Sequence, residues 1–202
     1  MPILPGNLAK ITTGYLDTVN DIGVMSQVAG DITERNKLGQ LYAFTNADAL
    51  RHSSAAATRL YGGLYQYVKA GTALTKGQIV QWDTAANLGW TAFQVTSTVT
   101  APAEGFGYGI ACSTVTINRY AFIQVSGLAN VLYRASVTSK VLGNIVIQLT
   151  TTATADAIAD ATGTYISGGA LGLKNLIGTA YTIPVDGAIG LVMLKNNCIN
   201  EG

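Results

Sequence analysis

Hydrophobic and polar positions alternate along short segments of this chain, and glycine separates the segments. The clearest stretch is 65–82, which reads YQYVKAGTALTKGQIVQW, and a related stretch is 119–133, RYAFIQVSGLANVLY. Each places a run rich in Val, Ile, Thr and Tyr before a glycine and a second run after it. Alternation on short segments predicts half-buried strands, and the glycines predict turns. Each stretch is therefore predicted to be a strand, a turn and a second strand.

Further segments of this kind follow along the chain. The predicted strands are 64–70, 78–82, 92–98, 108–116, 120–126, 131–135, 145–150, 165–166 and 188–194. Turn signals separate them at Lys76-Gly77, Asn87-Leu88-Gly89, Ala101-Pro102, Asn118, Gly127, Gly143-Asn144 and Asp186-Gly187. Many short strands without intervening helices predict an all-β fold, a small β-barrel or sandwich. The low-complexity segment 150–164 is predicted to be a surface loop or a marginal helix.

The first sixty residues differ in texture from the rest. Prolines at positions 2 and 5 predict an extended arm. Charges cluster in this region at Asp17, Asp21, Asp31, Glu34, Arg35, Lys37, Asp48, Arg51 and Arg59. We expect a division into an N-terminal arm or mixed extension, 1–61, and a glycine-punctuated barrel domain, 62–202. Within the arm, 46–60 is predicted to be a short helix capped by Asn46, or a loop.

Composition favours a protein that makes lasting contacts. Hydrophobic residues make up 49 % of the 202 residues, enough for a core, whereas charged residues make up only 11 %, well below the roughly 25 % of an ordinary soluble domain. A neutral polar surface suits permanent protein contacts, because burying it desolvates few ions. An ordinary secreted β protein is the alternative interpretation.

The charge pattern excludes two classes of partner. The net charge is +1 and no cluster of Lys and Arg occurs, so we expect no nucleic-acid binding. Although the mean hydropathy is +0.31, no apolar run of about 20 residues exists to cross a bilayer as a helix. The first ten residues, MPILPGNLAK, do not resemble a signal peptide, and an exported barrel is not expected either.

The two cysteines, Cys112 and Cys198, lie far apart in the sequence. Cys112 falls within an apolar run, which predicts a buried free thiol. A disulfide needs an oxidising compartment, and the absence of a visible signal peptide argues against one. Neither cysteine has the CxxC spacing of a zinc site.

Residues that could support catalysis are sparse. His52 is the only histidine, and a single histidine cannot form a site with several His ligands. Ser53 or Ser54 with His52 and Asp48 would give the residue types of a triad, but adjacency in sequence does not supply triad geometry, and no GxSxG elbow occurs. We therefore expect no enzyme activity and no catalytic residues.

Nucleotide and metal sites are likewise not predicted. The segment 105–109, GFGYG, lacks the spacing of a dinucleotide-binding loop, and in 71–77 the lysine precedes the second glycine, unlike in a Walker A motif. The pairs Asp156 with Asp160 and Asp17 with Asp21 offer too few ligands for a calcium cage. No cofactor and no metal are expected.

Aromatic residues gather around the first predicted strand pair. They are Tyr61, Tyr65, Tyr67, Trp82 and Trp90. Alternation places Tyr65 and Tyr67 on the same face of one strand. We favour packing in the core and across strands, while a subunit contact or a carbohydrate-stacking platform remains an alternative.

Three of these segments in order, VKAGTALTKGQIVQW, GYGIACSTVTINRYAFIQVSG and DGAIGLVML, carry a family resemblance. They resemble the small capsid decoration, or cement, proteins of tailed bacteriophages. Gly71, Gly77, Gly109, Gly127 and Gly190 occupy the glycine positions of that pattern. The resemblance spans 64–134 and 184–195, about 80 of the 202 residues.

The resemblance implies a structural protein of the virion. It would be made in the host bacterial cytoplasm, bind the major capsid protein on the capsid exterior as a trimer or dimer, and stiffen the shell. An extended arm can add a strand to the sheet of a neighbour. Alternatives are another virion β protein, such as a tail-tube, neck or fibre-head component, or a carbohydrate-binding β module.

Overall fold

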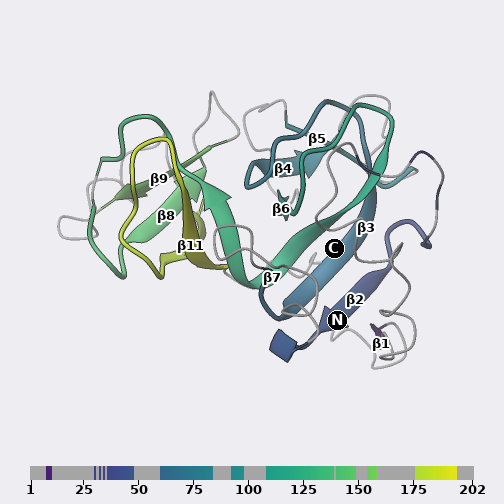
Figure 1. The fold of residues 1–202 in the computed structure, drawn as a ribbon, viewed down its shortest axis with the longest axis horizontal. Coiled ribbons are helices and arrows are strands. Elements are labelled where there is room, and N and C mark those ends of the chain that lie inside the picture. The colour runs from purple at the N-terminus through teal and green to yellow at the C-terminus, as the bar shows by residue number, and fades with distance from the viewer. Residues whose placement is uncertain are drawn as a thin grey trace.

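The computed structural model describes residues 8–10, 30, 32, 34, 36–47, 60–83, 92–97, 108–138, 140–148, 154–158 and 176–194. These residues form an all-β protein whose strands belong to one hydrogen-bonded sheet (Figure 1). The strands are β1 (Leu8–Lys10), β2 (Leu41–Phe44), β3 (Gly63–Ala70), β4 (Ile79–Trp82), β5 (Gln94–Thr96), β6 (Tyr108–Ala111), β7 (Tyr120–Leu132), β8 (Ile145–Gln148), β9 (Ala155–Ile158), β10 (Leu176–Ala180) and β11 (Ile189–Leu194). The predicted all-β class is confirmed.

Five of the described strands close into a first barrel. β3 pairs in parallel with β5, and β5 pairs antiparallel with β4. β4 then pairs with β6, β6 with β7, and β7 returns to β3, all antiparallel. The ring is complete because β3 bonds to β5 near its C-terminal end and to β7 along its whole length.

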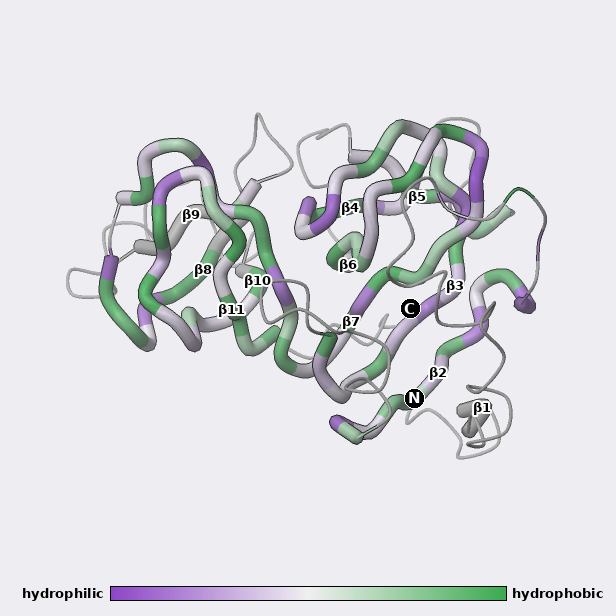
Figure 2. Tube along the Cα trace, viewed as in Figure 1, coloured by the Kyte–Doolittle hydropathy of each residue, from purple (hydrophilic) through white to green (hydrophobic). Residues whose placement is uncertain are grey.

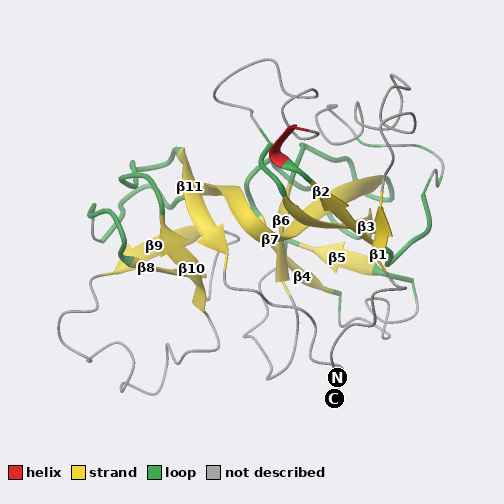
Figure 3. Cartoon of the chain, turned by 90° about the horizontal axis from the view of Figure 1, so that it is seen from below, coloured by secondary structure: helices red, strands yellow, loops and turns green. Residues whose placement is uncertain are grey.

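The C-terminal half of β7 opens a second barrel with the same order of strands. Tyr133, directly after β7, forms a parallel bridge with Ala155 of β9. β9 pairs with β8, β8 with β10, β10 with β11, and β11 with β7, all antiparallel. Among the described strands, β7, β8, β9, β10 and β11 thus repeat the arrangement of β3, β4, β5, β6 and β7. The last strand of the first barrel is the first strand of the second (Figures 1 and 3).

The turns of the two barrels are equivalent as well. In the first barrel, the N–H of Gly77 donates to the carbonyl oxygen of Ala111 at 2.9 Å. In the second, the N–H of Gly143 donates to the carbonyl oxygen of Ala180 at 2.8 Å. Both glycines have a φ of +82°, a conformation that glycine adopts without steric cost. The chain therefore contains a duplicated structural unit.

Buried side chains form three clusters. One lies inside the first barrel and includes Val68, Val80 and Ile123. A second lies inside the second barrel around Val131, Tyr133, Val146 and Val192, and includes Ile79 and Ile110. Ile79 and Ile110 come from β4 and β6, so they join the two barrels by apolar contact.

The third cluster lies on the outer side of the first barrel. Alternation along β3 sends Tyr65 and Tyr67 away from Val68, and they pack with Phe122 against Tyr42 and Phe44 of β2. β2 is hydrogen-bonded to β3 in antiparallel register. The strand that covers this face comes from the N-terminal region, and the boundary at 61/62 stays a prediction.

Two features of the predicted strand pattern are wrong. Gly127 does not turn the chain: β7 runs through it without interruption, with φ +93° at the glycine. A Cβ there would lie 2.5 Å from the Gly62 carbonyl oxygen, so the glycine permits a close approach of two backbones. The strands on either side of Gly77 do not pair with each other either, because β4 pairs with β5 and β6.

The structure also contains strands that the alternation did not predict. They are β1, β2, β9 and β10. The segment 150–164, predicted as a loop or marginal helix, contributes β9, because register pairing with β8 imposes the extended conformation. The predicted strand 165–166 lies outside the described residues.

The predicted helix in the N-terminal region is described only at its start. Asn46 and Ala47 have helical geometry (red in Figure 3), and the remainder to residue 59 lies outside the described residues. The side chain of Asn46 accepts a hydrogen bond from the N–H of Gly62 at 2.7 Å. Leu60 is buried with the outer cluster.

Candidate interaction surface

Exposed apolar side chains concentrate on the second barrel. Among the described residues, large hydrophobic side chains more than a third exposed there are Val141, Leu142, Tyr181, Ile183, Val185, Ile189 and Met193. Hydrophobic positions accordingly recur in the loops of this barrel as well as in its strands (green in Figure 2). Large contiguous apolar patches on a folded protein mark contact surfaces.

Strand register places several of these residues on one face. Met193 lies opposite Leu128, and Ile189 lies opposite Leu132, in the pairing of β11 with β7. Leu191 shares their face by alternation, and the N–H of Tyr181 donates to its carbonyl oxygen at 2.8 Å. Asn130 lies between Leu128 and Leu132 on the same side of β7, opposite Leu191. We call the apolar residues of this side, Leu128, Leu132, Tyr181, Ile189, Leu191 and Met193, the outer apolar face.

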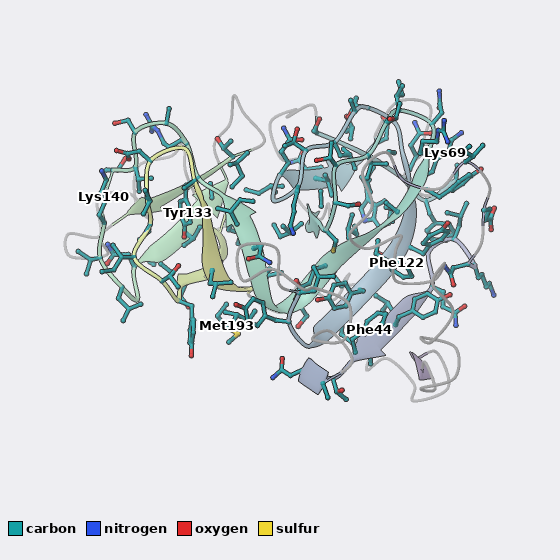
Figure 4. All side chains as sticks on the ribbon, in the orientation of Figure 1. Phe44, Lys69, Phe122, Tyr133, Lys140 and Met193 are labelled. Carbon is teal, nitrogen blue, oxygen red and sulfur yellow. The ribbon has the colours of Figure 1, made fainter. Side chains whose placement is uncertain are left out.

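The outer apolar face lies on the opposite side of the strands from the barrel interior. Val192 is fully buried, whereas its neighbour Met193 is 44 % exposed. In Figure 4, Tyr133 lies within the barrel, and Met193 lies at its outer side. The second barrel therefore has its own buried core, and the outer apolar face is a separate apolar surface outside that core.

The corresponding face of the first barrel is covered. In the duplicated unit, Tyr65 of β3 corresponds to Leu128 of β7, and Phe122 corresponds to Leu191. Tyr65 is fully buried and Phe122 is 2 % exposed, because β2 and Leu60 lie over them. Phe44 meets the Tyr65 ring edge-to-face at 4.9 Å. One copy of the duplicated face is thus closed within the chain.

Asp186 makes an ion pair and a backbone hydrogen bond at the end of the second barrel. The ammonium of Lys140 donates to Oδ2 of Asp186 at 2.6 Å, and the N–H of Val137 donates to Oδ1 at 2.6 Å. The hydrogen bond from Lys140, followed by that from Val137, lowers the pKa of Asp186. The carboxylate joins two loops distant in sequence, and the two opposite charges neutralise each other locally.

Cys112 has the predicted environment of a buried thiol. Its side chain is 4 % exposed and is free of any disulfide. Burial raises the pKa of the Cys112 thiol to about 12. A thiol held protonated in this way is a poor nucleophile. Cys198 lies outside the described residues.

Three of the aromatic residues singled out by sequence, Tyr65, Tyr67 and Trp82, pack in the core as favoured. Tyr65 and Tyr67 share one face and are both fully buried. The hydroxyl of Tyr65 donates to the carbonyl oxygen of Tyr61, and burial raises the pKa of Tyr65. Trp82 is 5 % exposed and belongs to the core inside the first barrel, so it is separated from the tyrosines. Trp90 lies outside the described residues.

Within the described part of the chain, the other candidate residues form no catalytic or metal centre. His52, Ser53, Ser54, Asp48, Asp17, Asp21 and Asp160 lie outside it, and Asp156 is described only as part of β9. The glycines at 105 and 107 also lie outside it. The bare side of Gly109 faces Ile123, whose Cδ1 would lie 2.6 Å from an added Cβ. Among all the residues that the structure describes, no group of His, Cys, Asp or Glu is placed to hold a metal ion. No helix among them is long and apolar enough to span a membrane.

Comparison with solved structures finds a likeness to a phage protein. The fold is similar to the N base of the head fibre protein gp8.5 of bacteriophage phi29, with a TM-score of 0.42 and 10 % sequence identity. The superposition covers 65 % of this chain and 93 % of that one. No protein-family model matches the sequence, and no curated protein matches it.

Sequence reasoning did not find the outer apolar face. Its residues come from 128–132 and 181–193, where alternation predicts strands with one buried face. The available signal was β11 itself, IGLVML, in which every residue but the glycine is apolar. A strand that is apolar on both faces needs cover on both.

Proposed function

We propose that this protein is a structural component of a tailed-phage virion that binds the capsid exterior as an oligomer and stabilises the shell. The outer apolar face carries the proposal. An uncharged apolar sheet face on a closed barrel suits a permanent protein contact, and it offers no group for chemistry. No catalytic role is proposed for any residue.

The sequence resemblance supports a capsid protein as the larger partner. The glycine pattern of 64–134 and 184–195 resembles that of the capsid decoration proteins. Charged residues make up only 11 % of the chain, which suits a surface that is buried in protein contacts. Contacts repeated over a symmetric shell act together through effective concentration, so each of them can be weak.

Binding to purified, expanded capsids that lack this protein tests the proposal. We expect the fluorescently labelled chain to co-sediment with the capsids until a fixed number of sites is filled. Capsids first saturated with unlabelled chain serve as the control and should bind no label. Failure to co-sediment at micromolar concentrations would contradict the proposal.

Imaging of labelled particles separates the proposal from its nearest alternative. A capsid decoration protein covers the shell at many symmetry-related positions. Label confined to a single vertex or to the tail would instead assign the chain to a neck, tail or fibre-head component, and would contradict attachment across the shell.

A further inference from the structure

We infer that the outer apolar face of the second barrel is where two copies of this chain bind each other, the same face of each meeting across a twofold axis. The inference deepens the oligomeric part of the proposed function and rests on it, but it does not require the capsid. It specifies both the contact surface and its occupant.

The duplicated unit shows what this face requires. On the first barrel, the equivalent face becomes a core once apolar side chains of β2 cover it, and Tyr65 and Tyr67 lose all solvent exposure. On the second barrel, Ile189 and Met193 remain 39 % and 44 % exposed. Several equivalent positions are apolar in both barrels, since Leu128 and Leu191 match Tyr65 and Phe122, although Asn130 stands where the first barrel has Tyr67. In the described part of the chain, no strand pairs with the C-terminal half of β7 in the way that β2 pairs with β3.

The charge distribution favours a second copy as the cover of this face. The six residues of the face carry no charge, so a twofold contact brings no like charges together. In the adjoining loops, Lys140 pairs with Asp186 at 2.6 Å, so these two charges are neutralised within the chain. An acidic or basic partner would find no complementary charge on the face.

Exposed apolar side chains continue from the face into the adjoining loops. Tyr181, Ile183 and Leu142 at its margin are 57 %, 61 % and 60 % exposed. Together with Ile189 and Met193 they are more than a third exposed, and exposed apolar residues that gather in this way mark contact surfaces. A standard interface buries about 800 Å² on each partner, so polar neighbours such as Thr179, which lies opposite Met193, contribute to the contact as well.

Sedimentation equilibrium of the full-length chain from about 1 to 100 µM tests the inference. We expect a dimer of twice the 21.0 kDa chain mass. The double variant Ile189→Glu/Met193→Glu should weaken the dimer by about 100-fold or more, because charges at the centre of an apolar interface are left without partners. Ile117→Glu is the matched control, since Ile117 is 49 % exposed on the first barrel, and it should dimerise normally.

A second variant guards against misfolding of the double variant. Thr179 is exposed and lies opposite Met193 in the pairing of β10 with β11. Thr179→Glu removes no apolar side chain, so it should keep the melting temperature while still weakening the dimer. A wild-type monomer across the concentration range, an odd number of copies, or a dimer indifferent to both changes would overturn the inference.

Capsid binding is measured in parallel so that the two proposals can fail separately. A wild-type monomer that decorates capsids would overturn the self-contact and leave the capsid assignment standing. A dimer that is disrupted by Thr179→Glu but ignores capsids would support the self-contact and contradict the assignment.

Discussion

Leu74 and Val115 exchange two backbone hydrogen bonds, each N–H donating to the other residue's carbonyl oxygen, at 2.8 and 2.9 Å. The bridge joins the loop after β3 to the loop after β6. Both side chains are 2 % exposed and belong to the core of the first barrel. The two loops therefore close one end of this barrel.

Removing the Leu74 side chain should destabilise the first barrel. Leu74→Ala is expected to lower the free energy of unfolding by about 2 to 5 kcal/mol, because it removes buried methyl groups and leaves a cavity. Urea denaturation followed by tryptophan fluorescence measures the change. Leu142→Ala, at a position 60 % exposed, should change it by less than about 0.5 kcal/mol in the monomer.

Gly127 should tolerate a side chain far less well than Gly143. Both have positive φ, +93° and +82°, so alanine costs roughly 1 to 2 kcal/mol of conformational energy at either position. At Gly127 the new Cβ would also lie 2.5 Å from the Gly62 carbonyl oxygen, whereas nothing lies within 4 Å at Gly143. Thermal melts of Gly127→Ala and Gly143→Ala should show the larger loss at Gly127. Equal losses would contradict the close backbone approach.

The hydrogen bonds to Asp186 should make the folded protein less stable at acidic pH. The pKa of Asp186 is lowered from the ordinary 3.8, chiefly by the hydrogen bond from Lys140. A depressed folded-state pKa gives stability that is present above the unfolded pKa and lost as pH falls through the lower folded value. Between about pH 5 and 2, the melting temperature of the wild type should therefore fall more steeply than that of Asp186→Asn. Parallel curves for the two proteins would contradict this role.

Cys112 should resist alkylation in the folded protein. With burial raising the thiol pKa to about 12, almost no thiolate exists at pH 8. In a Cys198→Ser background, we expect iodoacetamide to label Cys112 only after unfolding in urea, as detected by intact mass. Rapid labelling of the native protein would show that the site opens without global unfolding.

Phe44 should be required for the cover over the first barrel. It meets Tyr65 and Phe122 edge-to-face at 4.9 and 6.2 Å. Phe44→Ala is expected to cost about 3 to 5 kcal/mol, measured by chemical denaturation. Ile32→Ala, at a position 74 % exposed, is the control in the same N-terminal region and should have little effect.

Turn residues were the most predictable part of the fold. Gly77, Asn118, Gly143 and Gly187 were predicted as turns, and all four have positive φ. Glycine and asparagine adopt this conformation at low cost, so their presence between apolar runs carries local information. The all-β class followed from the same local signals.

Long-range pairing was not predictable from those signals. Gly127 has the residue type of a turn but lies within a strand, where it permits close contact with Gly62. The residues of β9, ADAI, include no strong β former except Ile158, so only pairing with β8 makes them a strand.

The duplication is not visible in the sequence because the two units have few identical residues. The segments 109–118 and 178–187 occupy equivalent places in the two barrels, yet GIACSTVTIN and GTAYTIPVDG share only the first glycine and the alanine two residues later. What the two units have in common is hydrogen bonding and the burial of apolar positions, which many sequences satisfy. The outer apolar face was missed for the same reason, since its meaning depends on comparing one unit with the other.

β7 forms one wall of each barrel along a single run of thirteen residues. A hinge between the two units would have to break this strand, together with its ladders to β3 and β11. The shared strand therefore constrains the two barrels to move together.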